Sequence, residues 1–284
     1  MFKISLIGLG FVGNAMYESF KKKEVNIIEA YDKFKNGGIG TIVKTLNSNI
    51  SFWNLPTIFD ENKNSYDLEP IYEVAEYFSK NNYNGIIVIK STITPGTIEK
   101  LSEDFSNLKF VHNPEFLTAR TAVEDFENQK HIVLGYNNKY NETDIEFLKN
   151  FYEQYYPDAE ISISSCTESE SMKIFVNCFY AVKIQFFNEL FLLCQKNGCS
   201  YKKVKDMMLK NGWINNMHTN VPGPDGMLSY GGLCFPKDTN ALLQYMKKNN
   251  TPSEVLEATI NERNKLRTDF DNYKKTEKNK VCYN

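Results

Sequence analysis

Residues 2–32, FKISLIGLGFVGNAMYESFKKKEVNIIEAYD, decide the fold. Residues 2–7 alternate and then become apolar, which predicts a strand that enters a buried core. GLGFVG follows at once at 8–13 and opens a segment with helical spacing and a lysine-rich end, which suits a helix C-terminus. A second apolar stretch ends at Asp32 and predicts another strand. Strand, glycine-rich turn, helix and strand in this order predict the first unit of a parallel α/β sheet.

The same alternation continues through the first half of the chain. Predicted strands lie at 51–57, 85–90, 108–116 and 131–136, predicted helices at 68–80 and 97–106, and a loop at 59–67. The continuous apolar run GIIVIK at 85–90 is typical of a strand covered on both faces. We therefore expect an α/β fold whose N-terminal part is a Rossmann-type, doubly wound parallel sheet.

The second half has a different pattern. One long helix is expected from Thr167 to Gly198, with Thr167 and Glu170 as its capping box. Further helices are expected at 201–211, from Asp238 to 248, and at 252–267, with a Gly/Pro loop from Trp213 to Pro236. These patterns predict a smaller all-helical domain after the sheet.

Length and composition exclude several classes of protein. The chain has 284 residues, of which 42% are hydrophobic and 24% charged, and its formal net charge is −2. This composition supports a buried core and argues against a disordered chain or a globally basic nucleic-acid binder. Six scattered cysteines without a CxxC pair and three distant histidines argue against a disulfide framework or a metal site.

No segment predicts a membrane span or a leader peptide. The apolar stretch at 4–13 has no small-residue cleavage site after it and runs into charged residues. No run of residues approaches the roughly 18 apolar positions of a membrane helix. We therefore expect a cytoplasmic protein without a membrane or nucleic-acid partner.

The glycine-rich turn indicates a dinucleotide site. Its glycines allow a tight turn and a close approach of the backbone to a pyrophosphate at a helix N-terminus. Asp32 would accept hydrogen bonds from the adenosine ribose and so favours NAD, while Lys33 and Lys35 allow for some tolerance of the NADP phosphate. A purely structural glycine turn is the alternative. STITPGT at 91–97 follows a predicted strand, at the edge where open α/β sheets bind ligands.

A second group of residues centres on GGLCFPKD at 231–238. Two glycines let the backbone come close to Cys234, and the ammonium of Lys237 would stabilise a nucleophilic thiolate. The carboxylate of Asp238 would orient or activate water. The alternative is a cysteine that is only a small buried hydrophobe.

Two further groups contain candidate catalytic side chains. Lys173 and Asn177 lie four residues apart on one face of the expected long helix, with Asn188 further along it. They would hold an oxygen whose charge changes during reaction, or else form a solvated helix face. Glu115, in HNPEFL at 112–117, is a candidate general base or else a surface carboxylate.

Taken together and in this order, these segments resemble the UDP-glucose/GDP-mannose dehydrogenase family, most closely its UDP-glucose 6-dehydrogenases. The matching stretches are GLGFVG, LPT at 55–57, STITPGT, NPEFL with TAVEDF, ESESMKIFVN, FFNE at 186–189 and GGLCFPKD. They extend from about residue 2 to residue 267. Several motifs in one order are more specific than any one of them, and GG-x-C-x-PKD is the most distinctive.

The resemblance implies a four-electron oxidation of a sugar primary alcohol to a carboxylate by two NAD+ in succession. UDP-glucose, oxidised to UDP-glucuronate for polysaccharide biosynthesis, is the expected nucleotide-sugar substrate, with UDP-N-acetyl sugars and GDP-mannose as alternatives. Cys234 matches the nucleophile that captures the aldehyde as a thiohemiacetal and then forms a thioester. Lys173 and Asn177 match residues that hold the reacting oxygen.

The resemblance also assigns the remaining site residues. Asp238 and Thr92 match residues that position water, and Glu115 matches the carboxylate that assists thioester hydrolysis. Expected cofactor-binding residues are Gly8, Gly10, Phe11, Val12, Gly13, Asp32, Lys33, Pro56, Thr57, Ser91 and Thr92. Expected substrate-binding residues are Glu115, Phe116, Leu117, Lys173, Asn177, Tyr230, Gly231 and His218.

The chain also departs from the family pattern. The family usually carries a second glutamate four residues after Glu115, where this chain has Ala119. His218 stands near an arginine that the family donates across its dimer. We expect a short form without the family's C-terminal nucleotide-binding domain. Either this form holds the nucleotide through Tyr230, Gly231 and a dimer partner, or its nucleotide recognition is weak.

The expected organisation is an NAD-binding Rossmann-like domain at 1–165, a helical catalytic and dimerisation domain at 166–270, and a polar tail at 271–284. A homodimer is expected to form through the helices at 167–198 and 238–267. Two alternatives stay open. One is a two-electron 3-hydroxyacid-type dehydrogenase, which gives Cys234 no role, and the other is a catalytically impaired NAD-binding protein.

Overall fold

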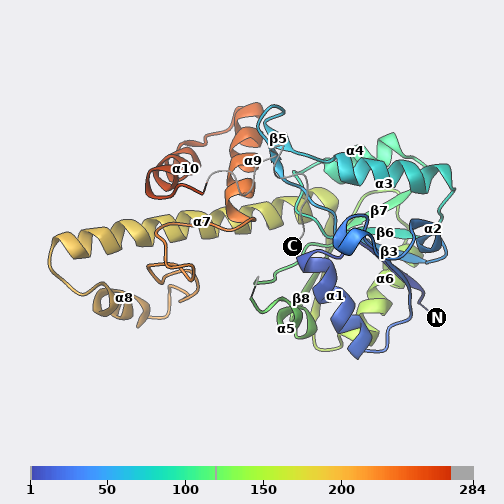
Figure 1. Cartoon of the computed structure of the whole chain (residues 1–284), viewed down its shortest axis with the longest axis horizontal. Helices are drawn as coiled ribbons and strands as arrows, with labels where there is room; N and C mark the ends of the chain where they lie inside the picture. The colour runs from blue at the N-terminus through green and yellow to red at the C-terminus, as the bar shows by residue number, and fades with distance from the viewer. Residues whose placement is uncertain (1, 119, 270–284) are drawn as a thin grey trace. The chain divides into compact units, whose positions relative to one another are not determined.

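The structure, a computed structural model, describes residues 2–118 and 120–269 (Figure 1). The expected polar tail at 271–284 lies outside the described residues, as do Ala119 and Cys282. In the described part of the chain, no helix combines the length and the apolar character that crossing a bilayer requires.

The described chain forms two compact units, residues 2–57 with 67–118 and 120–173, and residues 58–66 with 174–269. The first unit contains a seven-stranded sheet, in the order β2-β1-β3-β6-β7-β8-β9. Its strands are β1 (Ile4–Ile7), β2 (Ile27–Tyr31), β3 (Ile50–Trp53), β6 (Ile86–Ile89), β7 (Lys109–His112), β8 (His131–Tyr136) and β9 (Glu160–Ser165). The expected α/β sheet of the Rossmann type is thus confirmed.

One pair of neighbouring strands, β7 and β8, is antiparallel, whereas the other pairs of this sheet are parallel. Among its described residues, the connection between β7 and β8 contains one helix, α5 (Ala122–Glu127), which has 6 residues. Such a helix is about 9 Å long and does not return the chain along the sheet. The next connection uses α6 (Glu142–Tyr155), with 14 residues, and the pair β8–β9 is parallel. The sequence patterns had not indicated α6 or β9.

Helices cover both faces of this sheet (Figure 1). α1 (Phe11–Lys22), α5 and α6 pack on one face, and α3 (Glu69–Lys80) and α4 (Thr97–Asp104) pack on the other. β2 is the outermost strand on its side. Only the 3-10 turn η1 (Lys35–Gly37) and the short α2 (Ile42–Thr45) separate it from β3, which pairs with β1.

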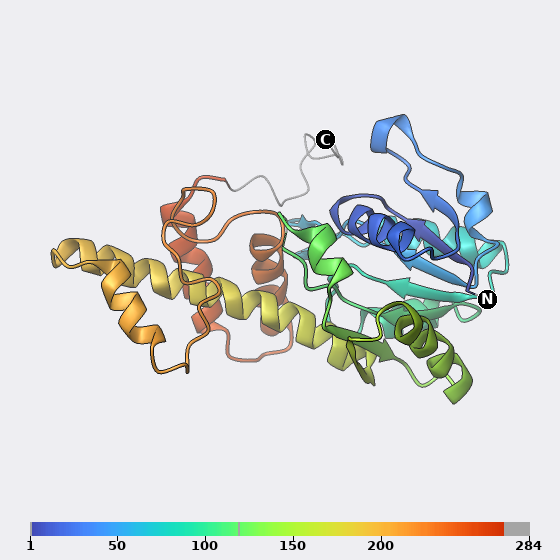
Figure 2. The ribbon, with the colours of Figure 1, turned by 90° about the horizontal axis from the view of Figure 1, so that it is seen from below.

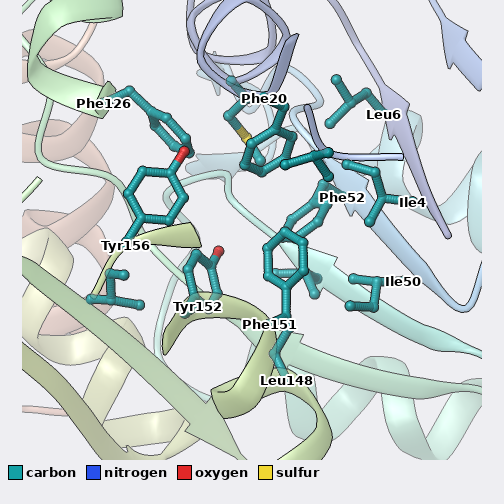
Figure 3. Packing of buried hydrophobic residues seen from close by; sticks show 14 of the residues in the cluster. Ile4, Leu6, Phe20, Ile50, Phe52, Phe126, Leu148, Phe151, Tyr152 and Tyr156 are labelled. Atoms are coloured by element: carbon teal, nitrogen blue, oxygen red, sulfur yellow. The ribbon is translucent and has the colours of Figure 1, made fainter. Parts of the chain in front are cut away.

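Aromatic side chains fill the core beneath α1. The Phe20 ring lies 5.6 Å from Phe52, 5.8 Å from Phe126 and 5.7 Å from Phe151, measured between ring centroids. Figure 3 shows these rings gathered around Phe20, with Tyr156 at the side. Because α1 follows the glycine-rich turn directly, this packing also fixes the orientation of that turn.

The long helix α7 (Cys166–Lys196) confirms the helix expected at 167–198, but its capping box differs from the expected one. The Glu168 N–H donates to Ser165 Oγ at 3.2 Å, and the Ser165 N–H donates to the Glu168 carboxylate at 2.8 Å. This reciprocal pair is the capping box, two residues before the predicted pair Thr167 and Glu170. Glu170 is fully buried instead, with a different set of donors.

The second unit is helical except for one hairpin. It contains the later part of α7, α8 (Tyr201–Leu209), α9 (Phe235–Lys248) and α10 (Glu254–Leu266). Figure 2 shows α8 turning back beside α7, and Phe191 of α7 contacts Tyr201 of α8 with ring centroids 5.4 Å apart.

The hairpin consists of β4 (Phe59–Asp60) and β5 (Ser65–Tyr66), and it packs against α9. The sequence patterns had predicted a loop here. α9 begins at Phe235, three residues before the expected start, so Asp238 lies in its first turn.

We expect Phe20→Ala to lower the free energy of unfolding by about 3–5 kcal/mol, because the residual cavity would lie among rings that cannot close it. Urea denaturation followed by circular dichroism measures this change. A loss below about 1 kcal/mol would contradict the packing described for Phe20.

Candidate active site

The glycine-rich turn is compatible only with glycine at two positions. Gly8 has φ +83°, and a Cβ placed on it would lie 2.5 Å from the Asn54 carbonyl oxygen. A Cβ on Gly13 would lie 1.9 Å from the Gly8 carbonyl oxygen. Gly10 is the N-cap residue of α1 and supplies no side-chain cap. The first N–H groups of α1 therefore face a turn without side-chain bulk, as an anionic ligand requires.

Asp32 holds this turn through its carboxylate. Oδ2 accepts from the Leu9 N–H at 2.7 Å, and Oδ1 accepts from the N–H groups of Phe34 and Lys35 at 2.9 Å each. Lys33 turns to another partner, because its ammonium lies 2.6 Å from the Glu73 carboxylate. The position of Asp32 at the end of β2 suits a ribose contact, which stays a prediction.

Two expected cofactor-binding loops are hydrogen-bonded to each other. Ser91 Oγ donates to the Leu55 carbonyl at 2.5 Å, and Thr57 Oγ1 donates to the Thr92 carbonyl at 2.8 Å. Within the described residues, the Asn54 side-chain amide is buried without a hydrogen-bond partner beside Gly8 and Gly13. The sequence patterns did not single out Asn54. A compact turn, a bare helix N-terminus and an unsatisfied amide together fit a dinucleotide.

Glu115 and Lys173 form an ion pair in the first unit. Lys173 Nζ lies 3.2 Å from the Glu115 carboxylate and donates to the Glu115 carbonyl at 2.6 Å. The Leu117 N–H donates to the same carboxylate at 2.7 Å, and the ammonium lies 5.5 Å from the Phe116 ring centroid. The structure thus brings together four residues that the sequence placed in the site.

A buried amine that the sequence patterns missed lies next to this pair. Lys90 is 2% exposed, and its Nζ donates to the Asn113 amide oxygen at 2.7 Å. Burial lowers the pKa of Lys90 to about 7. The charge of Lys173 also lowers this pKa, whereas the Glu115 carboxylate raises it. Lys90 directly precedes Ser91 and Thr92, so its position helps to set the start of that loop.

His112 fixes the same loop from β7. Burial lowers its pKa to about 3, so the imidazole is neutral at ordinary pH. Because the Ser91 carbonyl only accepts, His112 Nε2 donates to it at 3.3 Å, and Nδ1 accepts from the Ser169 hydroxyl at 2.8 Å.

Glu170 anchors the other end of the loop. Its carboxylate accepts from the N–H groups of Gly96 and Ile98 at 2.6 and 2.7 Å, at the N-terminus of α4. Burial raises the pKa of Glu170 to about 7, although these two N–H groups favour its charged form. One turn later on α7 comes Lys173, so Glu170 links the loop to that lysine's helix.

Asp238 is the centre of the second unit's polar cluster. It is fully buried, and its Oδ2 accepts from Asn177 Nδ2 at 2.6 Å. Lys237 Nζ and the Tyr66 hydroxyl both donate to Oδ1 at 2.5 Å. The ammonium of Lys237, expected to stabilise the Cys234 thiolate, is thus hydrogen-bonded to this carboxylate. Tyr66 was not singled out in the sequence.

Cys234 is exposed at the end of the segment 229–234, here called the strap, which packs against two arginines. Arg263 Nε donates to the Tyr230 carbonyl at 3.2 Å. A Cβ on Gly231 would lie 2.2 Å from an Arg267 nitrogen, so any larger residue there would have to displace this guanidinium. Asn188 accepts from the Ser229 N–H at 2.8 Å and supports the same strap.

His218 also belongs to the second unit. Its ring centroid lies 4.6 Å from that of Tyr180 and 5.5 Å from that of Phe235, which directly follows Cys234. Burial and the charge of Lys183 lower the pKa of His218. The lowered pKa disfavours the charged imidazole, so His218 does not supply the permanent charge of an arginine.

Comparison with known proteins identifies related sequences. Residues 39–156 match the NAD binding domain of the UDP-glucose/GDP-mannose dehydrogenase family, and residues 167–265 match its central domain. A UDP-glucose 6-dehydrogenase of Rickettsia bellii is 36% identical over 200 residues, which are 68% of this chain and 44% of that protein. The matched part thus spans less than half of that relative.

Solved structures share the fold. A UDP-glucose dehydrogenase from Pyrobaculum islandicum superposes with a TM-score of 0.80 at 23% identity, over 93% of this chain and 68% of that one. A 3-hydroxyisobutyrate dehydrogenase from Mycobacterium tuberculosis gives a TM-score of 0.71 at 15% identity, over 96% of both chains. Because the identities are low, these likenesses bear on the fold alone.

The lowered pKa of Lys90 has a consequence for stability. Between pH 7 and about 10.5 the unfolded chain binds more protons at Lys90 than the folded chain, so its contribution makes folding more favourable as pH rises. We expect the unfolding free energy of the wild type to rise relative to Lys90→Met by up to about 1.4 kcal/mol per pH unit in this window.

Urea denaturation at pH 7 and pH 9 measures the difference. Lys80→Met, which removes an exposed lysine of α3, serves as the control and should follow the wild type. Parallel pH dependences of the wild type and Lys90→Met would show that Lys90 keeps its charge in the folded protein.

Proposed function

Because the chain belongs to the UDP-glucose/GDP-mannose dehydrogenase family, we propose that it oxidises a nucleotide sugar with NAD+, and that UDP-glucose is converted to UDP-glucuronate. The observation that carries this proposal is the segment from Cys234 to Asp238. An exposed thiol stands four residues before a fully buried carboxylate that three donors hold. A two-electron dehydrogenase has no use for this thiol.

The first unit supplies the cofactor site. The turn at 8–13, with Asp32 and the linked loops around Leu55 and Ser91, would hold the dinucleotide. NAD+ bound there would accept one hydride in each of the two oxidation steps. The residues of the chain do the remaining work: they bind the sugar, move protons and capture the intermediate.

Lys173 and Asn177 would act on the reacting oxygen. They lie one turn apart on α7, and both are buried. An ammonium and an amide held by Glu115 and Asp238 are fixed before substrate arrives, which favours stabilisation of a developing oxyanion. Release of the alcohol proton would accompany the first oxidation.

Cys234 would keep the aldehyde bound. Its sulfur adds to the aldehyde carbon to form a thiohemiacetal, and the second oxidation leaves a thioester. Water then attacks the thioester carbon, the C–S bond breaks, and the products are the carboxylate, a proton and the free thiol. Asp238, Thr92 and Glu115 are the groups that we assign to this hydrolytic step.

Cys234→Ser tests the covalent route. We expect the variant to form no carboxylate, because an oxygen ester does not replace the thioester, while NAD+ affinity stays within about twofold. Product analysis by mass spectrometry and titration of NAD+ by fluorescence measure the two effects.

Cys199→Ser, which removes another exposed thiol of the second unit, is the matched control and should keep full activity. Full carboxylate formation by Cys234→Ser would rule out the covalent mechanism.

The later part of α7 supports a homodimer. Phe175, Phe179, Phe186 and Leu193 are each at least 52% exposed. Their spacing of 4, 7 and 7 residues places them on one face of the helix. An apolar stripe of this length is typical of a helix that packs on another chain, and a second copy is the partner that the family resemblance implies.

Phe186→Asp would place a charge in the middle of this stripe. We expect it to convert the dimer to a monomer at micromolar concentration, as measured by light scattering. Met207→Asp, which changes an exposed apolar residue of α8 outside the stripe, should leave the dimer intact. A wild type that is already monomeric would sink the dimer proposal.

A further inference from the structure

Tyr66 has an unusual position for a residue of the first half of the chain. It ends the hairpin β4–β5, which belongs to the second unit although β3 precedes it and β6 follows it in sequence. The side chain is 3% exposed and packs where the hairpin meets α9. The hairpin between β3 and β6 thus places Tyr66 among the helices of the second unit.

The hydroxyl of Tyr66 is committed to Asp238. It donates to Asp238 Oδ1 at 2.5 Å across 172 positions of sequence. Asn177 takes Oδ2 and Lys237 takes Oδ1, so three of about four acceptor positions of the carboxylate are used. Within the described residues, these donors leave about one acceptor position of the carboxylate, on Oδ2.

The surroundings of Tyr66 keep its hydroxyl protonated, so that it acts as a hydrogen-bond donor. Burial, together with the charge of Asp238 and the hydrogen bond to it, raises the pKa of Tyr66 far above its ordinary value. The Lys237 ammonium lies 4.7 Å from the Tyr66 ring centroid, so the ring also holds the cation that shares Oδ1. Burial and the same carboxylate raise the pKa of the nearby Cys178 thiol well above its usual range.

We propose that Tyr66 is a positioning residue for Asp238, and that its hydroxyl fixes the carboxylate in the orientation from which Asp238 directs the water that cleaves the thioester. The proposal rests on the function proposed above. Asn177 holds Oδ2 from α7 and Lys237 is its sequence neighbour, so Tyr66 is the donor from outside these two helices. A phenylalanine would fill the same space, so the hydroxyl is the group that tyrosine adds to the site.

The step that depends on this geometry is the hydrolysis of the thioester. Water forms a C–O bond to the thioester carbon and gives a proton to the Asp238 carboxylate while the C–S bond breaks. The sulfur leaves as the Cys234 thiolate and then takes up that proton from Asp238. The oxidations precede this step, so they do not require Asp238 in the same orientation.

Tyr66→Phe separates the two stages. With a saturating supply of NAD+ and UDP-glucose, we expect a rapid burst of NADH from the oxidations of the first turnover. The steady-state rate that follows should be about 10- to 100-fold below that of the wild type, the usual effect of losing a hydrogen bond to a charged group. A purely structural defect would lower burst and steady state by the same factor.

Tyr72→Phe is the matched control. It removes a hydroxyl that also donates to an aspartate, Asp104, at 2.8 Å, but on the first unit's surface. We expect it to keep wild-type burst and steady-state rates. An unchanged steady-state rate in Tyr66→Phe, with an active wild type, would overturn the Tyr66 proposal alone.

A double-mutant cycle tests whether Tyr66 acts through Asp238. In the Asp238→Asn background, Tyr66→Phe should slow the residual rate by less than about twofold. A full additional loss would show that Tyr66 acts elsewhere and overturn the proposal. Absence of NADH formation by the wild type itself would overturn the proposed function and this inference together.

Discussion

A carboxylate withdrawn from water has to be matched by donors, and Asp238 imposes this condition on the second unit. Its three donors come from a hairpin, from α7 and from α9. The condition explains why β4 and β5 pack with the helices and not with the sheet that surrounds them in sequence. It also means that Asn177 and Lys237 are positioned before any substrate binds.

Charged side chains of the first unit are also matched by donors or by opposite charges. Glu115 is paired with Lys173, Glu170 with two N–H groups of the α4 N-terminus, and Asp32 with three backbone N–H groups. Lys90 meets this condition differently, because burial lowers its pKa to about 7 and so weakens its hold on the proton. Fixed dipoles of this kind cost no reorganisation during reaction, as the proposed hydride and acyl chemistry requires.

Local patterns identified much of this protein. Hydrophobic periodicity is strong in the strand and helix at 2–22 and in α7, so these elements could be predicted. The turn between that strand and helix could be predicted as well, because steric constraints require glycine there. The hairpin at 59–66 was missed because two-residue strands show no period. Tyr66 was missed because no spacing rule connects residues 172 positions apart. Lys90 was interpreted as the end of a strand. Its lowered pKa follows from its burial, which the sequence does not show.

We propose that this chain oxidises an alcohol to a carboxylate without releasing the aldehyde. The most direct test is the amount of NADH formed per UDP-glucose consumed, with the sugar limiting and NAD+ in excess. We expect two NADH for each sugar, with UDP-glucuronate as the product. One NADH per sugar, or none despite measurable NAD+ binding, would contradict it and favour a two-electron dehydrogenase or a catalytically impaired NAD-binding protein, respectively.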